Sequence, residues 1–111
     1  MFRATTPIHN FCFRDINPEE FKTILITYAQ NDKIVIEKGK DDLTIWTEEV
    51  EGETHYHASL TLTQEETKLF IAKPTSTVVI QIRAIDYNGN VVASNKMSLS
   101  VFDVLNDEVL A

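Results

Sequence analysis

The spacing of apolar residues constrains the fold of this chain more than any other feature, because it recurs every two positions rather than every 3.6. A period of two places successive side chains on opposite faces of an extended strand. The alternation is clear in residues 54–61 and strongest in residues 78–86, where Val78, Ile80, Ile82 and Ala84 share one face. We therefore predict a mainly β protein.

Turn-forming residues divide the alternating pattern into segments. The predicted strands are residues 6–14, 21–30, 33–38, 43–50, 54–61, 78–86 and 91–101. Hairpin turns are predicted at Asn31-Asp32, at Glu51-Gly52 and most strongly at Asn88-Gly89, because a type I′ turn needs positive φ at both central residues. In the predicted strand 33–38, which follows the Asn31-Asp32 turn, Ile34 and Ile36 are expected to face the core.

Two segments carry helix-start signals instead. Asn17-Pro18 offers an N-cap followed by proline at the first helical position. Thr63 and Glu66 have the spacing of a capping box. We predict one or two short helical turns, which would connect the sheets.

Seven or so strands in a chain of 111 residues, with turns about every 8 to 12 residues, are typical of an immunoglobulin-like sandwich. We predict this all-β fold with antiparallel strands in a single domain over residues 1–111, with residues 103–111 as a tail; a small Greek-key barrel fits the same pattern. Hydrophobic residues form 43% of the chain, so a core can form although the single cysteine excludes an internal disulfide.

The charge balance excludes several partners. The net charge is −7, and no cluster of Lys and Arg is present, so we expect no nucleic acid partner. No apolar run reaches the roughly 18 residues of a membrane span, and the start lacks a secretory signal, so we expect no membrane partner and a cytoplasmic location. Residues 41–53 carry six acidic side chains and no basic one, which predicts a negative flank.

Catalytic and metal sites find little support in the sequence. His55 and His57 share one face of a strand, roughly 6 to 7 Å apart, and two imidazoles are weak candidates for a zinc site that needs a third ligand. Cys12 and His9 lie three residues apart on one strand, hence on opposite faces, so Cys12 is interpreted as a small buried hydrophobe. We expect no metal, no cofactor and no enzymatic activity.

Aromatic side chains supply the remaining candidates for a binding site. Trp46 lies on the face opposite Leu43 and Ile45. Because lone tryptophans usually pack, we expect it in the core or in a subunit interface; if its face points outward, it marks a binding patch. The candidate binding residues are therefore Trp46, Tyr56, His55 and His57.

Five stretches carry a resemblance that runs nearly from end to end of the chain: residues 6–11 (TPIHNF), 26–31 (ITYAQN), 62–67 (LTQEET), 81–83 (QIR) and 107–110 (DEVL). In this order they resemble a group of small uncharacterised proteins encoded among the tail and structural genes of prophages of Gram-positive bacteria. The resemblance implies a setting and no site residues. The segment from Trp46 to His57 is longer here than in that group.

The resemblance and the lack of a catalytic pattern predict a virion-associated structural or adaptor protein. It would act by protein–protein contact with other virion proteins or with a second copy of itself, in the host bacterial cytoplasm during assembly and in the virion. The alternative is a carbohydrate- or cell-wall-binding module that uses Trp46, Tyr56, His55 and His57. A small metal-dependent enzyme is a third hypothesis.

Overall fold

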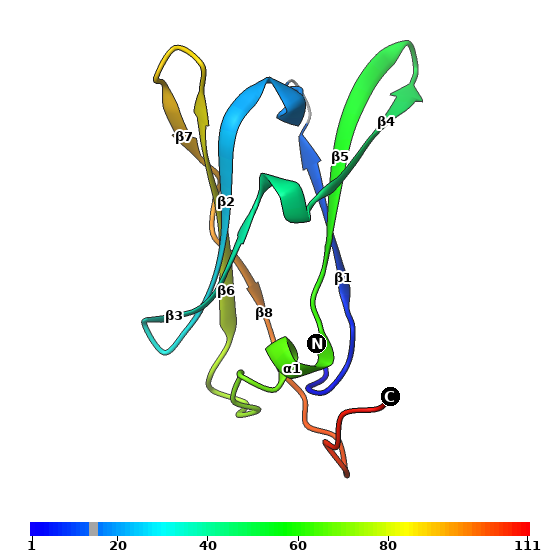
Figure 1. The fold of residues 1–111 in the computed structure, drawn as a ribbon, viewed down its shortest axis with the longest axis vertical. Helices are drawn as coiled ribbons and strands as arrows, with labels where there is room; N and C mark the ends of the chain where they lie inside the picture. The colour runs from blue at the N-terminus through cyan, green and yellow to red at the C-terminus, as the bar shows by residue number, and fades with distance from the viewer. Residues whose placement is uncertain (14–15) are drawn as a thin grey trace.

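The computed structural model describes residues 1–13 and 16–111, which form a sandwich of two antiparallel sheets (Figure 1). The three-stranded sheet has the order β1-β5-β4, with bounds Ile8–Phe13, Glu53–Thr61 and Thr44–Val50. The five-stranded sheet has the order β3-β2-β6-β7, and β8 also pairs with β6. Its strands are β3 (Lys33–Gly39), β2 (Phe21–Gln30), β6 (Val78–Asp86), β7 (Val91–Ala93) and β8 (Met97–Leu99).

This strand order is that of an immunoglobulin-like sandwich, as the sequence predicts. The sheet β1-β5-β4 matches strands B, E and D of such domains, and β3-β2-β6-β7 matches the sheet that contains strands C, F and G. Three short helical segments cross between the sheets: η1 (Pro18–Glu20), η2 (Lys40–Asp42) and α1 (Gln64–Thr67). The first and third are the predicted helical turns, whereas η2 was not predicted.

Side-chain caps start both predicted helical turns. The Asn17 side chain accepts a hydrogen bond from the Glu19 amide at 3.0 Å. At α1, Thr63 Oγ1 accepts from the Glu66 amide at 3.1 Å, and Glu66 Oε1 accepts from the Thr63 amide at 3.0 Å. The capping box read from the sequence is therefore confirmed. None of the helices formed by the described residues is long and apolar enough to span a membrane.

The core lies between the sheets and draws on the inward face of each. Its buried residues include Phe11 and Leu60 from one sheet, with Ile24, Ile26, Tyr28, Val78 and Ile80 from the other. The Tyr28 hydroxyl lies 2.7 Å from His9 Nδ1, which links β2 to β1 across the core. Burial raises the pKa of Tyr28, helped by the charge of Glu66, and burial together with the N-terminal charge lowers the pKa of His9. The pair is therefore an uncharged polar contact at neutral pH.

The turns agree with the sequence in position and differ in one detail. Asn31 and Asp32 have φ values of 55° and 61°, as a type I′ hairpin requires. At the β6–β7 hairpin only Gly89 has positive φ, at 86°. There the Gly89 amide donates to the Asp86 carbonyl, and the Asp86 carboxylate accepts from the amides of Asn88 and Asn90. The expected type I′ turn is therefore wrong, because a longer loop organised by Asp86 replaces it.

Three further expectations need correction or qualification. The predicted strand 91–101 is broken into β7 and β8 at Ser94. The Ser94 amide donates to the Ile82 carbonyl, and the Ser94 hydroxyl accepts from the Ile82 amide, so a side chain replaces a backbone group in the ladder. Ile34 is 63% exposed rather than in the core, since a register shift between Tyr28 and Ala29 separates it from buried Ile36. The predicted end of the first strand, Arg14, lies outside the described residues.

The predicted tail, residues 103–111, has no regular secondary structure but is held at two points. Arg3 contacts Asp103 at 2.9 Å and Asp107 at 3.4 Å. The Gln64 side chain exchanges two hydrogen bonds with the backbone of Leu110, both 2.8 Å long. The tail therefore lies near α1, at the end of the sandwich away from the β4–β5 turn (Figure 1).

Candidate functional site

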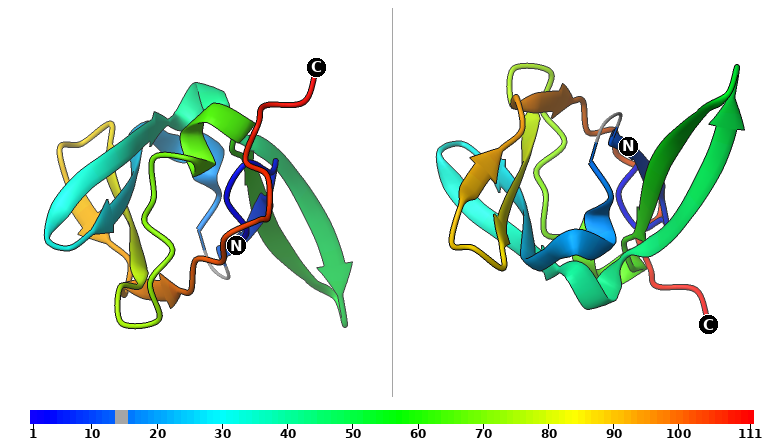
Figure 2. Two further views of the ribbon diagram at one scale, coloured as in Figure 1. Left: turned by 90° about the horizontal axis from the view of Figure 1, so that it is seen from below. Right: turned by 90° about the horizontal axis from the view of Figure 1, so that it is seen from above.

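The hairpin of β4 and β5 diverges from the five-stranded sheet, and the distance between them increases toward the β4–β5 turn (Figures 1 and 2). Its tip residues, Glu51 and Gly52, have φ values of 53° and 82°, which gives the sharp two-residue turn the sequence predicts. Near the tip, Thr54 Oγ1 donates to Glu49 Oε1 at 2.7 Å and joins the two strands. Because the strands diverge from the second sheet, most hairpin side chains retain contact with solvent.

One row of side chains crosses the outward face of the three-stranded sheet. Cys12 of β1 is paired with His57 of β5, and His57 is paired with Trp46 of β4. Directly opposed residues in antiparallel strands project from the same face. Glu48 is paired with His55 one step nearer the tip. We call these five residues, Cys12, Trp46, Glu48, His55 and His57, the outer hairpin face.

Trp46 is the most prominent member of the outer hairpin face. Its ring stacks on that of His57 with centroids 5.3 Å apart and an interplanar angle of 15°. The residue is still 40% exposed, so Trp46 does not lie in the core, whereas its expected place in a subunit interface stays a prediction. The physical reason is that Trp46 projects from the outward face of the three-stranded sheet, away from the second sheet, so its ring packs beside His57 rather than between the sheets. Trp46 presents apolar surface to solvent.

Each imidazole of the outer hairpin face lies beside its own carboxylate. His57 Nε2 lies 3.1 Å from Glu48 Oε2, but the two atoms are not aligned for a hydrogen bond. The nitrogen itself is buried and has no hydrogen-bond partner among the described residues. His55 Nε2 lies 3.8 Å from Glu53 Oε2. Residues 1–13 and 16–111 contain no group of three or more His, Cys, Asp or Glu side chains placed to hold a metal ion.

Tyr56 does not belong to this face. It is paired with Phe13 and Thr47 and projects from the inward side of the hairpin, as the alternation of residues 54–61 predicts. The structure thus brings together three of the four candidate binding residues, Trp46, His55 and His57, and separates the fourth. Sequence reasoning missed Glu48 and Cys12 as neighbours of these residues, although alternation in the first strand already set Cys12 opposite Phe11.

Cys12 is an exposed free thiol, so its interpretation as a buried hydrophobe is wrong. It stands on the outward side of β1, opposite buried Phe11. We expect Cys12 to react with Ellman's reagent in the folded protein at a rate within about tenfold of that in denaturant. A Cys12→Ser variant provides the baseline. A thiol that reacts only after denaturant is added would contradict the outward placement of Cys12.

No protein-family model matches the chain, and no curated protein is significantly similar to it in sequence.

Proposed function

We propose that this chain is a structural or adaptor domain of a phage or prophage particle and that it binds another protein through the outer hairpin face. The observation that carries the proposal is the exposure of Trp46 on a hairpin that projects from the sandwich. Tryptophan is enriched at protein interfaces and dominates their energetics when a partner buries it. An exposed, stacked indole is thus a pre-positioned anchor for a partner.

The charge around Trp46 indicates the chemistry of that partner. Glu48, Glu49, Glu51 and Glu53 surround the tip of the hairpin, and Asp41 and Asp42 precede it. Acidic side chains at the rim of an interface steer oppositely charged partners and reject like-charged ones. The partner we propose therefore offers an apolar recess for the indole, bordered by Lys and Arg.

The phage setting rests on the resemblance of residues 6–11, 26–31, 62–67, 81–83 and 107–110 to prophage structural-gene products. It is tested by inducing a host that carries the gene, purifying the released particles and measuring the chain in them by quantitative mass spectrometry. The proposal predicts a fixed copy number per particle. Absence of the chain from particles whose other structural proteins are complete would overturn it.

A carbohydrate- or cell-wall-binding role is the second candidate, and one observation favours it. Trp46, His55 and His57 share an outward face, and an indole can stack on a sugar ring. Binding of purified cell-wall glycan fragments, followed by the intrinsic fluorescence of the single tryptophan, tests this role. Saturable quenching that Trp46→Ala abolishes would favour the glycan over a protein partner, and no response would remove this candidate.

A further inference from the structure

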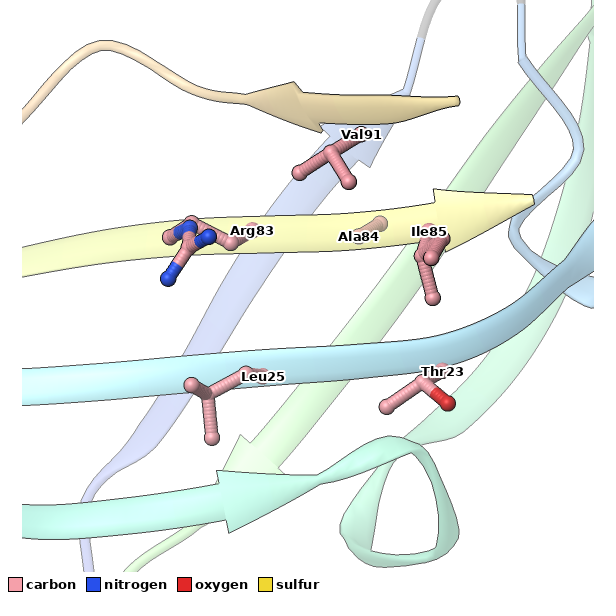
Figure 3. Close-up of a pocket in the computed structure, with 6 residues that line it drawn as sticks. All are labelled: Thr23, Leu25, Arg83, Ala84, Ile85 and Val91. Carbon is pink, nitrogen blue, oxygen red and sulfur yellow. The ribbon is translucent and has the colours of Figure 1, made fainter. Parts of the chain in front are cut away.

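The outward face of the five-stranded sheet is hollowed along β2 and β6. Two adjoining depressions of ≈ 230 Å³ and ≈ 400 Å³ share Leu25 and Arg83 in their lining. Figure 3 shows the first of them, with Thr23 and Leu25 from β2, Arg83 and Ile85 from β6 and Val91 from β7 around it. We call this hollow the β2–β6 trough and define its centre by Leu25, Thr27, Gln81 and Arg83.

Two acidic and two basic side chains line the trough. Asp32 and Glu37 belong to the side of β3, and Arg83 and Lys96 to the side of β6 and β8. All four residues are exposed. Within residues 1–13 and 16–111 none of the four takes part in an ion pair. The trough thus combines an apolar floor with unpaired charges of both signs.

The register places opposite charges at the two ends of one row across the sheet. Thr27 is paired with Glu37 on one side and with Gln81 on the other. Lys96 precedes Met97, the partner of Ile80, so it lies next to Gln81. The row therefore runs from Glu37 through small or uncharged side chains to Lys96. Arg83 is two residues from Gln81 on the same face of β6.

This distribution of charge fits a second copy of the same face. Consider a two-fold axis in the plane of contact, parallel to β2 and β6 and between them. It would set the β3 side of one copy against the β6 and β8 side of the other, at the same level along the strands. Glu37 of each copy would then face Lys96 of the other, with Arg83 close to the same carboxylate. A two-fold interface requires such self-complementarity.

We propose that the β2–β6 trough is the interface of a symmetric homodimer, in which Glu37 and Lys96 form two equivalent ion pairs around an apolar centre. Four strands about 4.8 Å apart and roughly seven residues long give each copy on the order of 400 to 500 Å² of contact. The two copies together would bury about 800 to 1,000 Å², which is the size of weak, transient interfaces, so the dimer should depend on concentration. The dimer would leave both outer hairpin faces free, and it does not rest on the proposed function.

Charge exchange at one pair of residues tests this proposal. The mass of the wild-type chain is measured over a concentration series by sedimentation equilibrium. Glu37→Lys and Lys96→Glu should each raise the dimer dissociation constant at least about tenfold, since each creates two like-charge contacts. An equimolar mixture of the two variants should associate again, because each copy then meets its complement. The double variant should also associate with itself.

The control separates a local contact from a change in net charge. Glu37→Lys makes this acidic chain less negative, so net charge alone would strengthen association rather than weaken it. Glu49→Lys changes the net charge by the same amount as Glu37→Lys but lies on the β4–β5 hairpin, outside the trough. It should leave the dimer intact. A wild-type chain that stays monomeric throughout the series would overturn the proposal. A dimer insensitive to both variants, or one lost equally in Glu49→Lys, would overturn it as well.

Discussion

Replacing Gln30 with leucine is expected to lower the free energy of unfolding by about 3 kcal/mol or more. Gln30 is the last residue of β2 and is only 4% exposed. Its Nε2 donates to the carbonyls of Ile71 at 2.7 Å and Ser76 at 3.1 Å, and its Oε1 accepts from the Ile71 amide at 2.7 Å. Leucine would leave these backbone groups without a partner in a partly buried position, and an unsatisfied buried group costs about 1 to 3 kcal/mol.

Gln64→Leu is the matched control for this prediction. Gln64 also makes two side-chain hydrogen bonds to backbone, both 2.8 Å long, but these are exposed to solvent. Water can replace them, so the expected loss is below about 1 kcal/mol. Urea unfolding of the three proteins, followed by tryptophan fluorescence, measures the difference. Equal losses for the two variants would refute the role we give to Gln30.

Phe70→Ala should destabilise the protein by about 3 to 5 kcal/mol. Phe70 follows α1, is 1% exposed, and packs its ring 6.2 Å from that of Tyr28. Its carbonyl accepts a hydrogen bond from Arg3 Nε at 2.9 Å, so the same residue also joins the N-terminal segment to the core. Truncation would open a cavity beneath Tyr28 that the surrounding strands cannot close.

The neighbouring residue provides the control for Phe70. Leu69 is 60% exposed, and we expect Leu69→Ala to change stability by less than about 0.5 kcal/mol. Should Phe70→Ala fail to fold, Phe70→Leu keeps the prediction testable, with an expected loss of about 1 to 2 kcal/mol. Thermal and urea unfolding measure each variant. A loss for Leu69→Ala as large as that for Phe70→Ala would contradict the observed burial.

Much of the fold follows from the sequence because its strands have one buried face. The strands at residues 21–30 and 78–86 are predicted to the residue, because apolar side chains recur every two positions from Ile24 to Tyr28 and from Val78 to Ala84. Asn31-Asp32 supplies the backbone that a tight hairpin needs. The break between β7 and β8 could not be predicted, since it depends on Ser94 bonding across to Ile82. The exposure of Ile34 likewise depends on a register shift between strands, which a local pattern does not encode.

The candidate site was only partly predictable for a similar reason. Alternation predicts that His55 and His57 share a face and that Tyr56 points the other way, and the structure confirms both. Whether Trp46 is buried depends on which face of β4 points between the sheets and on whether another layer covers the opposite face, and the spacing of residues 43–50 encodes neither. The pairing of Glu48 with His55 and its approach to His57 depend on the register between β4 and β5.

The occupancy of purified particles by Trp46→Ala, compared with the wild type expressed in the same host, tests the central claim most directly. Tyr87→Ala is the matched control, because Tyr87 is 72% exposed and lies outside the hairpin. Both variants should unfold at wild-type urea concentrations. We expect Trp46→Ala to occupy particles at least about tenfold less than wild type, and Tyr87→Ala to match it. Wild-type occupancy by Trp46→Ala would contradict binding through the outer hairpin face.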